Sequence, residues 1–167
     1  ALSREGGGAA ARAIMTTDTR PKESSRSFDL DGVTIAVGGM AKGAGMIAPN
    51  LAPLHATMLA FFTTDATIDR AMLEMALIEA VGPTFNRITV DSDTSTNDTA
   101  IALANGAAGA RSITGSGPGY ELLRDALREV SAPALHDARA QHVLFSFHGL
   151  PERHAKRTAA ACGSDCL

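Results

Sequence analysis

The sequence is poor in aromatic and cysteine residues. Its 167 residues include no tryptophan, one tyrosine and two cysteines, and aromatic residues make up 4% of the chain. A hydrophobic core must therefore be built from alanine, leucine, isoleucine, valine and methionine. Cys162 and Cys166 stand close together near the end of the chain, so they offer no disulfide framework for a domain. We expect a reducing, cytoplasmic compartment.

Long apolar runs and an excess of one charge are also missing. No run of about 18 apolar residues occurs, so no transmembrane helix is expected, and residues 1–10 lack the basic start and apolar middle of a signal peptide. Fifteen Lys and Arg against 18 Asp and Glu give a formal charge of −3. This balance excludes the basic footprint of a nucleic-acid or membrane binder. The length suffices for one domain with a core.

Periodicity and turn signals predict alternating strands and helices. Residues 6–8 should form a flexible lead-in and residues 20–27 a solvated loop. Asp31-Gly32 is a strong two-residue hairpin turn, and Asp65 or Thr67 is expected to cap the helix that follows. Strands are expected at 10–17, 28–30, 33–37, 57–62, 87–90 and 142–147, and helices at 68–80, 99–108 and 120–130. In the last helix the inward residues should be Leu123, Ala126, Leu127 and Val130.

One threonine stands in a suggestive context. Thr57 follows the small residue Ala56 and precedes an apolar run, in ATMLAFFTTDA at 56–66; KGAGMIAPN at 42–50 lies shortly before it. A threonine hydroxyl is a weak nucleophile, but chain cleavage on its N-terminal side frees an α-amine that can act as its base. That amine titrates near ~8, close to working pH. The alternative is an ordinary strand threonine, since β-branched residues favour strands.

Two further motifs join this one, AARAIMTTDT at 10–19 and TFNRITVDSDTSTNDTAIALANGAAG at 84–109. Together they resemble the ornithine acetyltransferase family, the bifunctional glutamate N-acetyltransferases of arginine biosynthesis, over about residues 9–130. The resemblance implies an α+β fold, a sandwich of β-sheets flanked by helices, incomplete here. It also implies self-cleavage between Ala56 and Thr57, followed by acetyl transfer from N-acetylornithine to glutamate through Thr57.

The resemblance also assigns substrate-binding residues and partners. It implies that Lys42 and Thr16 bind substrate, although a solvated loop lysine and a strand-end cap are the ordinary alternatives. It implies no cofactor, with acetyl-CoA as a further small-molecule substrate only where the second family activity is present. In the family the processed α and β chains assemble into an oligomer, so an oligomer is expected.

Two departures from the family pattern bear on activity. LAPLH at 51–55 is an apparent insertion before Ala56, and extra residues relax the strain that self-cleavage needs. The family's oxyanion donors lie upstream of 10–19, in a segment outside this sequence, so we expect the isolated chain neither to cleave nor to turn over. An inactive chimeric fragment is therefore an alternative.

An acidic loop, DSDTSTNDT at 91–99, has the residue types of a cation site. It lacks the glycine and the closing glutamate of an EF-hand, and loops of this composition hydrogen-bond to themselves. We interpret it as a structural loop near the active site.

The last part of the chain has a different character. SAPALHDARAQHVLFSFHGLPERH at 131–154 resembles ferrochelatase, which divides the chain into segments 1–130 and 131–167. That resemblance implies a metal-insertion role for His148, with Cys162 and Cys166 placed like the iron–sulfur ligands of some bacterial members. A lone histidine after a strand is more often a polar loop residue. A ferrochelatase-type metal or porphyrin protein is thus the alternative function.

Overall fold

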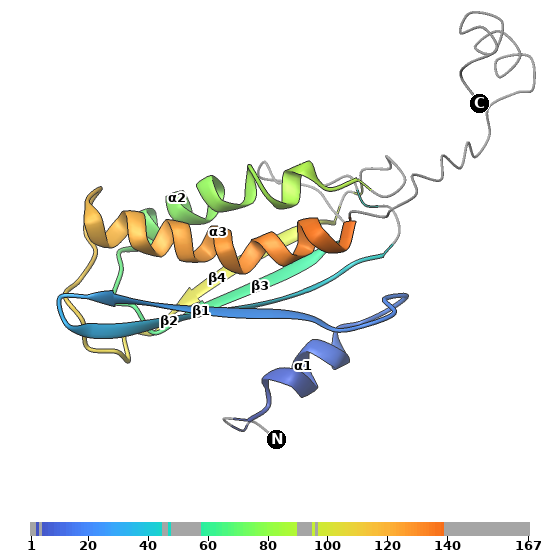
Figure 1. The fold of residues 1–167 in the computed structure, drawn as a ribbon, viewed down its shortest axis with the longest axis horizontal. Helices are drawn as coiled ribbons and strands as arrows, with labels where there is room; N and C mark the ends of the chain where they lie inside the picture. Colours follow the sequence, from blue (N-terminus) through green and yellow to red (C-terminus); the bar gives the residue numbers. More distant parts are fainter. Residues whose placement is uncertain are drawn as a thin grey trace, which may run out of the picture.

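The computed structural model describes residue 3, residues 5–44, residue 47, residues 58–89, residue 95 and residues 97–138. Within these residues the strands form one four-stranded sheet in the order β1-β2-β3-β4. Helices α2 (Arg70–Val81) and α3 (Pro118–Ala138) cover one face, and the short α1 (Gly7–Ala13) lies against the other (Figure 1). The chain thus has a mixed α and β fold, as the sequence predicted.

The first two strands form the predicted hairpin. β1 (Lys22–Leu30) and β2 (Val33–Lys42) pair antiparallel. Asp31 (φ 55°) and Gly32 (φ 80°) both adopt left-handed backbone conformations, the combination whose twist matches that of the flanking strands. The expected solvated loop at 20–27 is wrong, because β1 begins at Lys22. Its polar side chains are tolerated because β1 is an edge strand.

A helical crossover joins the two parallel strands. β3 (Leu59–Thr64) pairs in parallel with β4 (Thr99–Ala104), and α2 and a 3₁₀ turn (Phe85–Arg87) lie between them in the chain, as a parallel pair requires. The predicted helix at 68–80 is confirmed. Its N-cap is Asp69, so the expected cap at Asp65 or Thr67 is wrong. The expected strand at 57–62 begins at Leu59 and runs on to Thr64.

β4 stands where the sequence predicted a helix at 99–108, and that prediction is wrong. The strand pairs residue by residue with β3, from Leu59 opposite Thr99 onward. Ala100 and Ala102 pack against the core on the helix-covered face. Small side chains there leave room for α2. An alanine-rich run carries too little periodicity to distinguish a buried helix from a strand.

Three other local predictions are also wrong. Residues 10–17 do not form a strand, because α1 covers Gly7–Ala13 and buries Ala11. Alanine and arginine rank among the strongest helix formers, which accounts for the helix. The flexible lead-in expected at residues 6–8 is wrong as well, because α1 begins at Gly7. The strand expected at 87–90 is also wrong for its described residues, because Arg87 ends the 3₁₀ turn and Ile88 and Thr89 belong to no strand; Val90 lies outside the described residues.

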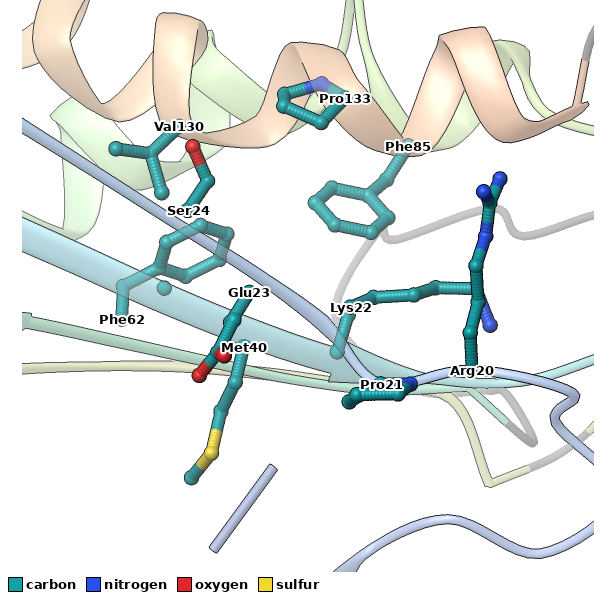
Figure 2. A pocket seen from close by; sticks show the side chains of 12 residues that line it. Arg20, Pro21, Lys22, Glu23, Ser24, Met40, Phe62, Phe85, Val130 and Pro133 are labelled. Atoms are coloured by element: carbon teal, nitrogen blue, oxygen red, sulfur yellow. The ribbon is translucent and has the colours of Figure 1, made fainter. Parts of the chain in front are cut away.

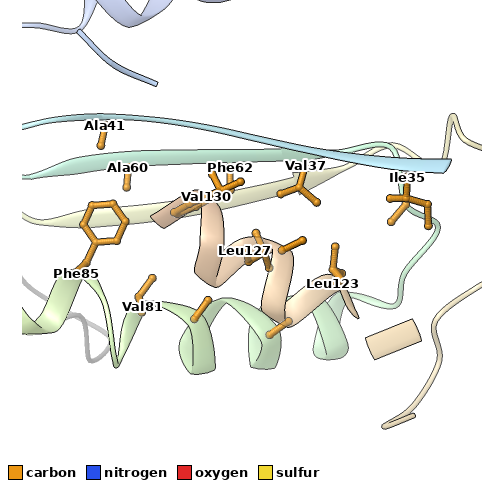
Figure 3. Close-up of a cluster of buried hydrophobic side chains, with 14 of the residues drawn as sticks. Ile35, Val37, Ala41, Ala60, Phe62, Val81, Phe85, Leu123, Leu127 and Val130 are labelled. Atoms are coloured by element: carbon orange, nitrogen blue, oxygen red, sulfur yellow. The ribbon is translucent and has the colours of Figure 1, made fainter. Parts of the chain in front are cut away.

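α3 closes the core. All four of its predicted inward residues are buried, and Figure 3 shows several of them directed at the sheet. Gly39 permits this contact, since a Cβ there would lie 2.5 Å from Val130 Cγ1. The core between sheet and helices includes Ile35, Val37, Ala60, Phe62, Val81, Phe85, Leu123, Leu127 and Val130. No helix in the described part of the chain combines the length and apolar character that crossing a bilayer requires.

Candidate functional site

Lys42 stands at one end of the sheet, where three strands meet. It is the last residue of β2, is half-buried, and pairs with Leu59, the first residue of β3. Leu59 in turn pairs with Thr99, the first residue of β4. Ala56 and Thr57 lie outside the described residues, and the described chain resumes at Met58. The end of β2 therefore lies beside the stretch of chain that follows directly on Thr57.

A buried aspartate fastens the Thr16 segment to this end of the sheet. The Asp18 side chain is 0% exposed. Its Oδ1 accepts the backbone N–H of Gly43 at 2.8 Å and pairs with Lys22 Nζ, and its Oδ2 accepts the N–H of Thr16 at 3.3 Å. Lys22 Nζ also donates to the Gly43 carbonyl at 3.2 Å. The structure thus brings together the two segments that carry Thr16 and Lys42.

Asp18 is ionised in this arrangement. Burial alone raises the pKa of a carboxyl group, but the bonds from Lys22, Gly43 and Thr16 outweigh it and hold the pKa of Asp18 below its ordinary value. The negative charge then offsets the ammonium group of Lys22. Lys42, which ends β2 at the same place, is half-buried.

A second buried aspartate comes from the acidic loop. Asp98 is 6% exposed, and its Oδ1 accepts the backbone N–H of Met58, which is itself 3% exposed. The N–H of Thr99 donates to the carbonyl of Met58 at 2.8 Å. Residues 91–94 and 96 of this loop lie outside the described residues. The last aspartate of the motif therefore holds the backbone at the entry to β3.

The two aspartates share a feature that the sequence did not reveal. Each accepts the N–H of the residue that follows a candidate site residue, Gly43 after Lys42 and Met58 after Thr57. The contacts of Asp18 and Asp98 span 25 and 40 positions in the chain, and local patterns carry no such information. The only sequence signal was the presence of both aspartates within the motifs themselves.

A cavity of about 190 Å³ opens beside Lys22, between the sheet and α3 (Figure 2). The cations of Arg20 and Lys22 line part of its wall. The rings of Phe62 and Phe85, which meet edge to face with centroids 6.1 Å apart, line another part. Ligand pockets are mostly apolar and carry a small number of placed polar groups, and the lining of this cavity combines both kinds of side chain.

The other predicted site residues contribute less to this geometry. Thr16 is exposed, and its backbone N–H is its described bond to the site. His148, Cys162 and Cys166 lie outside the described residues, so the ferrochelatase-like segment stays a prediction. Among the residues that the structure describes, no three His, Cys, Asp or Glu side chains gather in a way that suits a metal ion.

Known proteins match most of this chain. Residues 1–137 match the ArgJ family. The arginine biosynthesis bifunctional protein ArgJ of Symbiobacterium thermophilum is 53% identical over 130 residues, which are 78% of this chain and 31% of that protein. The glutamate N-acetyltransferase of Methanocaldococcus jannaschii is 61% identical over 100 residues, 60% of this chain and 24% of that protein.

This chain spans less than a third of the length of either curated relative. Among solved structures, the arginine biosynthesis bifunctional protein argJ of Bacillus halodurans is 41% identical and aligns with a TM-score of 0.42, covering 50% of this chain and 41% of that one. The family match runs to residue 137 and α3 to residue 138.

Proposed function

Because this chain belongs to the ArgJ family, we propose that it forms part of an acetyltransferase of arginine biosynthesis, one that moves the acetyl group of N-acetylornithine to glutamate. The names of its relatives support this function. The observation that carries the proposal is the pairing of Lys42 with Leu59, the second residue after Thr57, at one end of the sheet. A cation and the chain next to Thr57 are adjacent there, as acyl transfer to and from an amino acid requires.

Self-processing comes first in this proposal. Thr57 Oγ attacks the carbonyl carbon of Ala56, and the C–N bond between the two residues breaks. The product is an ester that joins the Ala56 carbonyl to Thr57 Oγ, with a free α-amine on Thr57. Water then hydrolyses the ester, which releases the carboxylate of Ala56 and restores the hydroxyl. The new α-amine serves as the general base for the hydroxyl.

Acetyl transfer follows by the same chemistry. Thr57 Oγ attacks the acetyl carbonyl of N-acetylornithine, the amide bond breaks, and ornithine leaves with its amine protonated. The α-amine of glutamate then attacks the acetyl-Thr57 ester, which yields N-acetylglutamate and the free hydroxyl. Lys42 and Thr16 orient the substrate, with the ammonium of Lys42 beside a substrate carboxylate. The reaction requires no cofactor, and acetyl-CoA is the donor only in the second family activity.

The face of the sheet opposite α2 and α3, against which only the short α1 lies in the described part of the chain, supports the sandwich proposed for the whole fold. Met40, Phe61 and Ile101 pair in register across β2, β3 and β4 on the face that α2 and α3 leave open. Ile101 is 38% exposed and Leu103 60% exposed. A row of apolar side chains on a sheet needs a covering layer. A second sheet, contributed by a family member's remaining chain, fits this row, within a cytoplasmic oligomer of processed chains.

The mass of the purified protein tests the proposal. Residues 1–137 replace the matching segment of the Symbiobacterium thermophilum relative. This hybrid, the exchanged full-length relative, is purified and incubated overnight. We expect two fragments that separate at Ala56–Thr57 and whose masses add up to the parent plus one water. The Thr57→Ala variant stays whole, and the matched variant Thr63→Ala, at an exposed threonine of β3, cleaves as the parent does. A single uncleaved mass for the parent contradicts the proposal.

A further inference from the structure

The backbone of Met58 is held on both sides by one short segment. Asp98 accepts its N–H, and the N–H of Thr99 donates to its carbonyl at 2.8 Å. Regular pairing of β3 with β4 begins one residue later, at Leu59 opposite Thr99. The carboxylate therefore extends the pairing by one residue, to the residue that directly follows Thr57.

Ordinary sheet pairing uses backbone carbonyls as acceptors. The side-chain acceptor at Met58 therefore adds a hydrogen bond that the pairing of β3 with β4 does not itself supply. Asp98 and Met58 are 6% and 3% exposed, so water competes little for this bond. The position of the Met58 amide is thus more firmly fixed than strand pairing alone requires.

The proposed cleavage between Ala56 and Thr57 makes the hydrogen bond from Met58 to Asp98 more important. Once the bond before Thr57 is broken, Met58 becomes the second residue of a new chain. Chain ends fray unless they are tied down, and a frayed end does not hold a nucleophile in line with its target. The hydrogen bond between Met58 and Asp98 lies one residue from the new N-terminus at Thr57.

We propose that Asp98 is a positioning residue for Thr57. By holding the N–H of Met58, it fixes the direction of the chain at the junction before cleavage and keeps the new terminus in place for acetyl transfer afterwards. This role rests on the proposed function. Asp98 acts through the backbone, so an acceptor of the same shape preserves the role and loss of the acceptor abolishes it.

Hydrogen exchange of single amides tests the hydrogen bond from Met58 to Asp98 independently of any activity. In this chain we expect a protected Met58 amide, exchanging at least tenfold faster in Asp98→Ala and close to the parent rate in Asp98→Asn, whose amide oxygen accepts the same N–H. The matched control is Asp65→Ala, which removes a 2.8 Å bond to the Ala36 N–H at the other end of β3. Circular dichroism reports whether each variant is folded. A folded Asp98→Ala protein with unchanged Met58 exchange overturns the inference.

The cleavage assay, run on the exchanged full-length relative, then tests the consequence. We expect Asp98→Ala to slow cleavage at Ala56–Thr57 by at least tenfold, Asp98→Asn to stay within about threefold of the parent, and Asp65→Ala to match the parent. Equal rates for Asp98→Ala and the parent, or equal slowing in Asp98→Ala and Asp65→Ala, overturn the positioning role alone. A parent that never cleaves although its Met58 amide is protected overturns the proposed function, and the positioning role with it.

Discussion

Removing the charge of Asp18 should destabilise the fold and change its response to acid. Asp18→Asn keeps the shape of the side chain but only one acceptor oxygen, so it retains the bond to the N–H of either Gly43 or Thr16 and loses the other. It removes the charged partner of the Lys22 ammonium, whose side chain is 23% exposed and which keeps its bond to the Gly43 carbonyl. The substitution therefore removes the ion pair and one hydrogen bond from the bridge between the Thr16 segment and the end of β2.

The expected cost follows from the bonds that change. A hydrogen bond to a charged group contributes about 1.5–3 kcal/mol, and breaking a buried ion pair costs about 3–5 kcal/mol. Lys22 is partly hydrated, which returns some of that energy, and the asparagine retains one neutral bond, to the N–H of Gly43 or Thr16. We expect a loss of about 2 kcal/mol in the free energy of unfolding near pH 7.

The pH dependence has a definite sign. The pKa of Asp18 is lowered in the folded protein, so its ionised form stabilises the fold fully above the unfolded value of about 3.9. That contribution is lost as the pH falls through the folded pKa. Asparagine does not titrate, so the gap between the two proteins should be constant near neutrality and close in acid below about pH 4.

Urea unfolding followed by circular dichroism measures the gap, because the chain has no tryptophan for fluorescence. The matched control is Asp31→Asn, which breaks an exposed pair with Arg111 whose side chains are 59% and 69% exposed. Such a pair contributes about 0–1 kcal/mol. The reasoning fails if Asp18→Asn costs no more than the control, or if the gap stays constant throughout the acid range.

Two glycine substitutions test the packing and the turn by urea unfolding. Gly39→Ala places a methyl group 2.5 Å from Val130 Cγ1, so we expect a loss of about 1–3 kcal/mol, which Val130→Ala in the same chain should partly restore; additive losses would contradict the predicted clash. Gly32→Ala meets no atom within 4 Å but keeps a φ of +80°, so backbone strain alone should cost about 1 kcal/mol. A neutral result at Gly32 would mean that the turn relaxes without cost.

The elements that the sequence predicted well are those whose signals are local. The Asp31-Gly32 pair specifies a hairpin turn by itself, and both residues have the positive φ angles that it requires. The helix at 120–130 shows a clear apolar period, and its inward face is buried as expected. In both cases the information lies within a few neighbouring residues.

The elements that failed depend on distant contacts. Residues 99–104 contain three alanines that suit a helix, but pairing with β3 makes them a strand. The strand prediction at 10–17 relied on an apolar run whose alanines instead form α1. Tertiary contacts thus override weak local preference in the first case, and intrinsic helix propensity prevails in the second.

In the candidate site, too, some residues could be predicted from local motifs and others only from the fold. Lys42 and Thr16 were proposed from motifs, and the structure brings their segments together. Asp18 was noted only as part of its motif and Asp98 as part of a loop interpreted as structural, because their bonds to Gly43 and Met58 span 25 and 40 positions. Lys22 was expected in a solvated loop, although it pairs with Asp18 at the start of β1. Sequence motifs thus suggested the candidate substrate-binding residues, whereas the contacts that support them required the fold.

The most direct test of the account follows an acetyl label. The exchanged full-length relative is mixed with N-acetylornithine labelled in its acetyl group, quenched in acid and digested, and the peptide that begins at Thr57 is analysed by mass spectrometry. The account predicts labelled acetyl on the Thr57 hydroxyl, its loss when glutamate is added, and no label in Thr57→Ala. Turnover of the labelled donor without label on Thr57 at any time would contradict it.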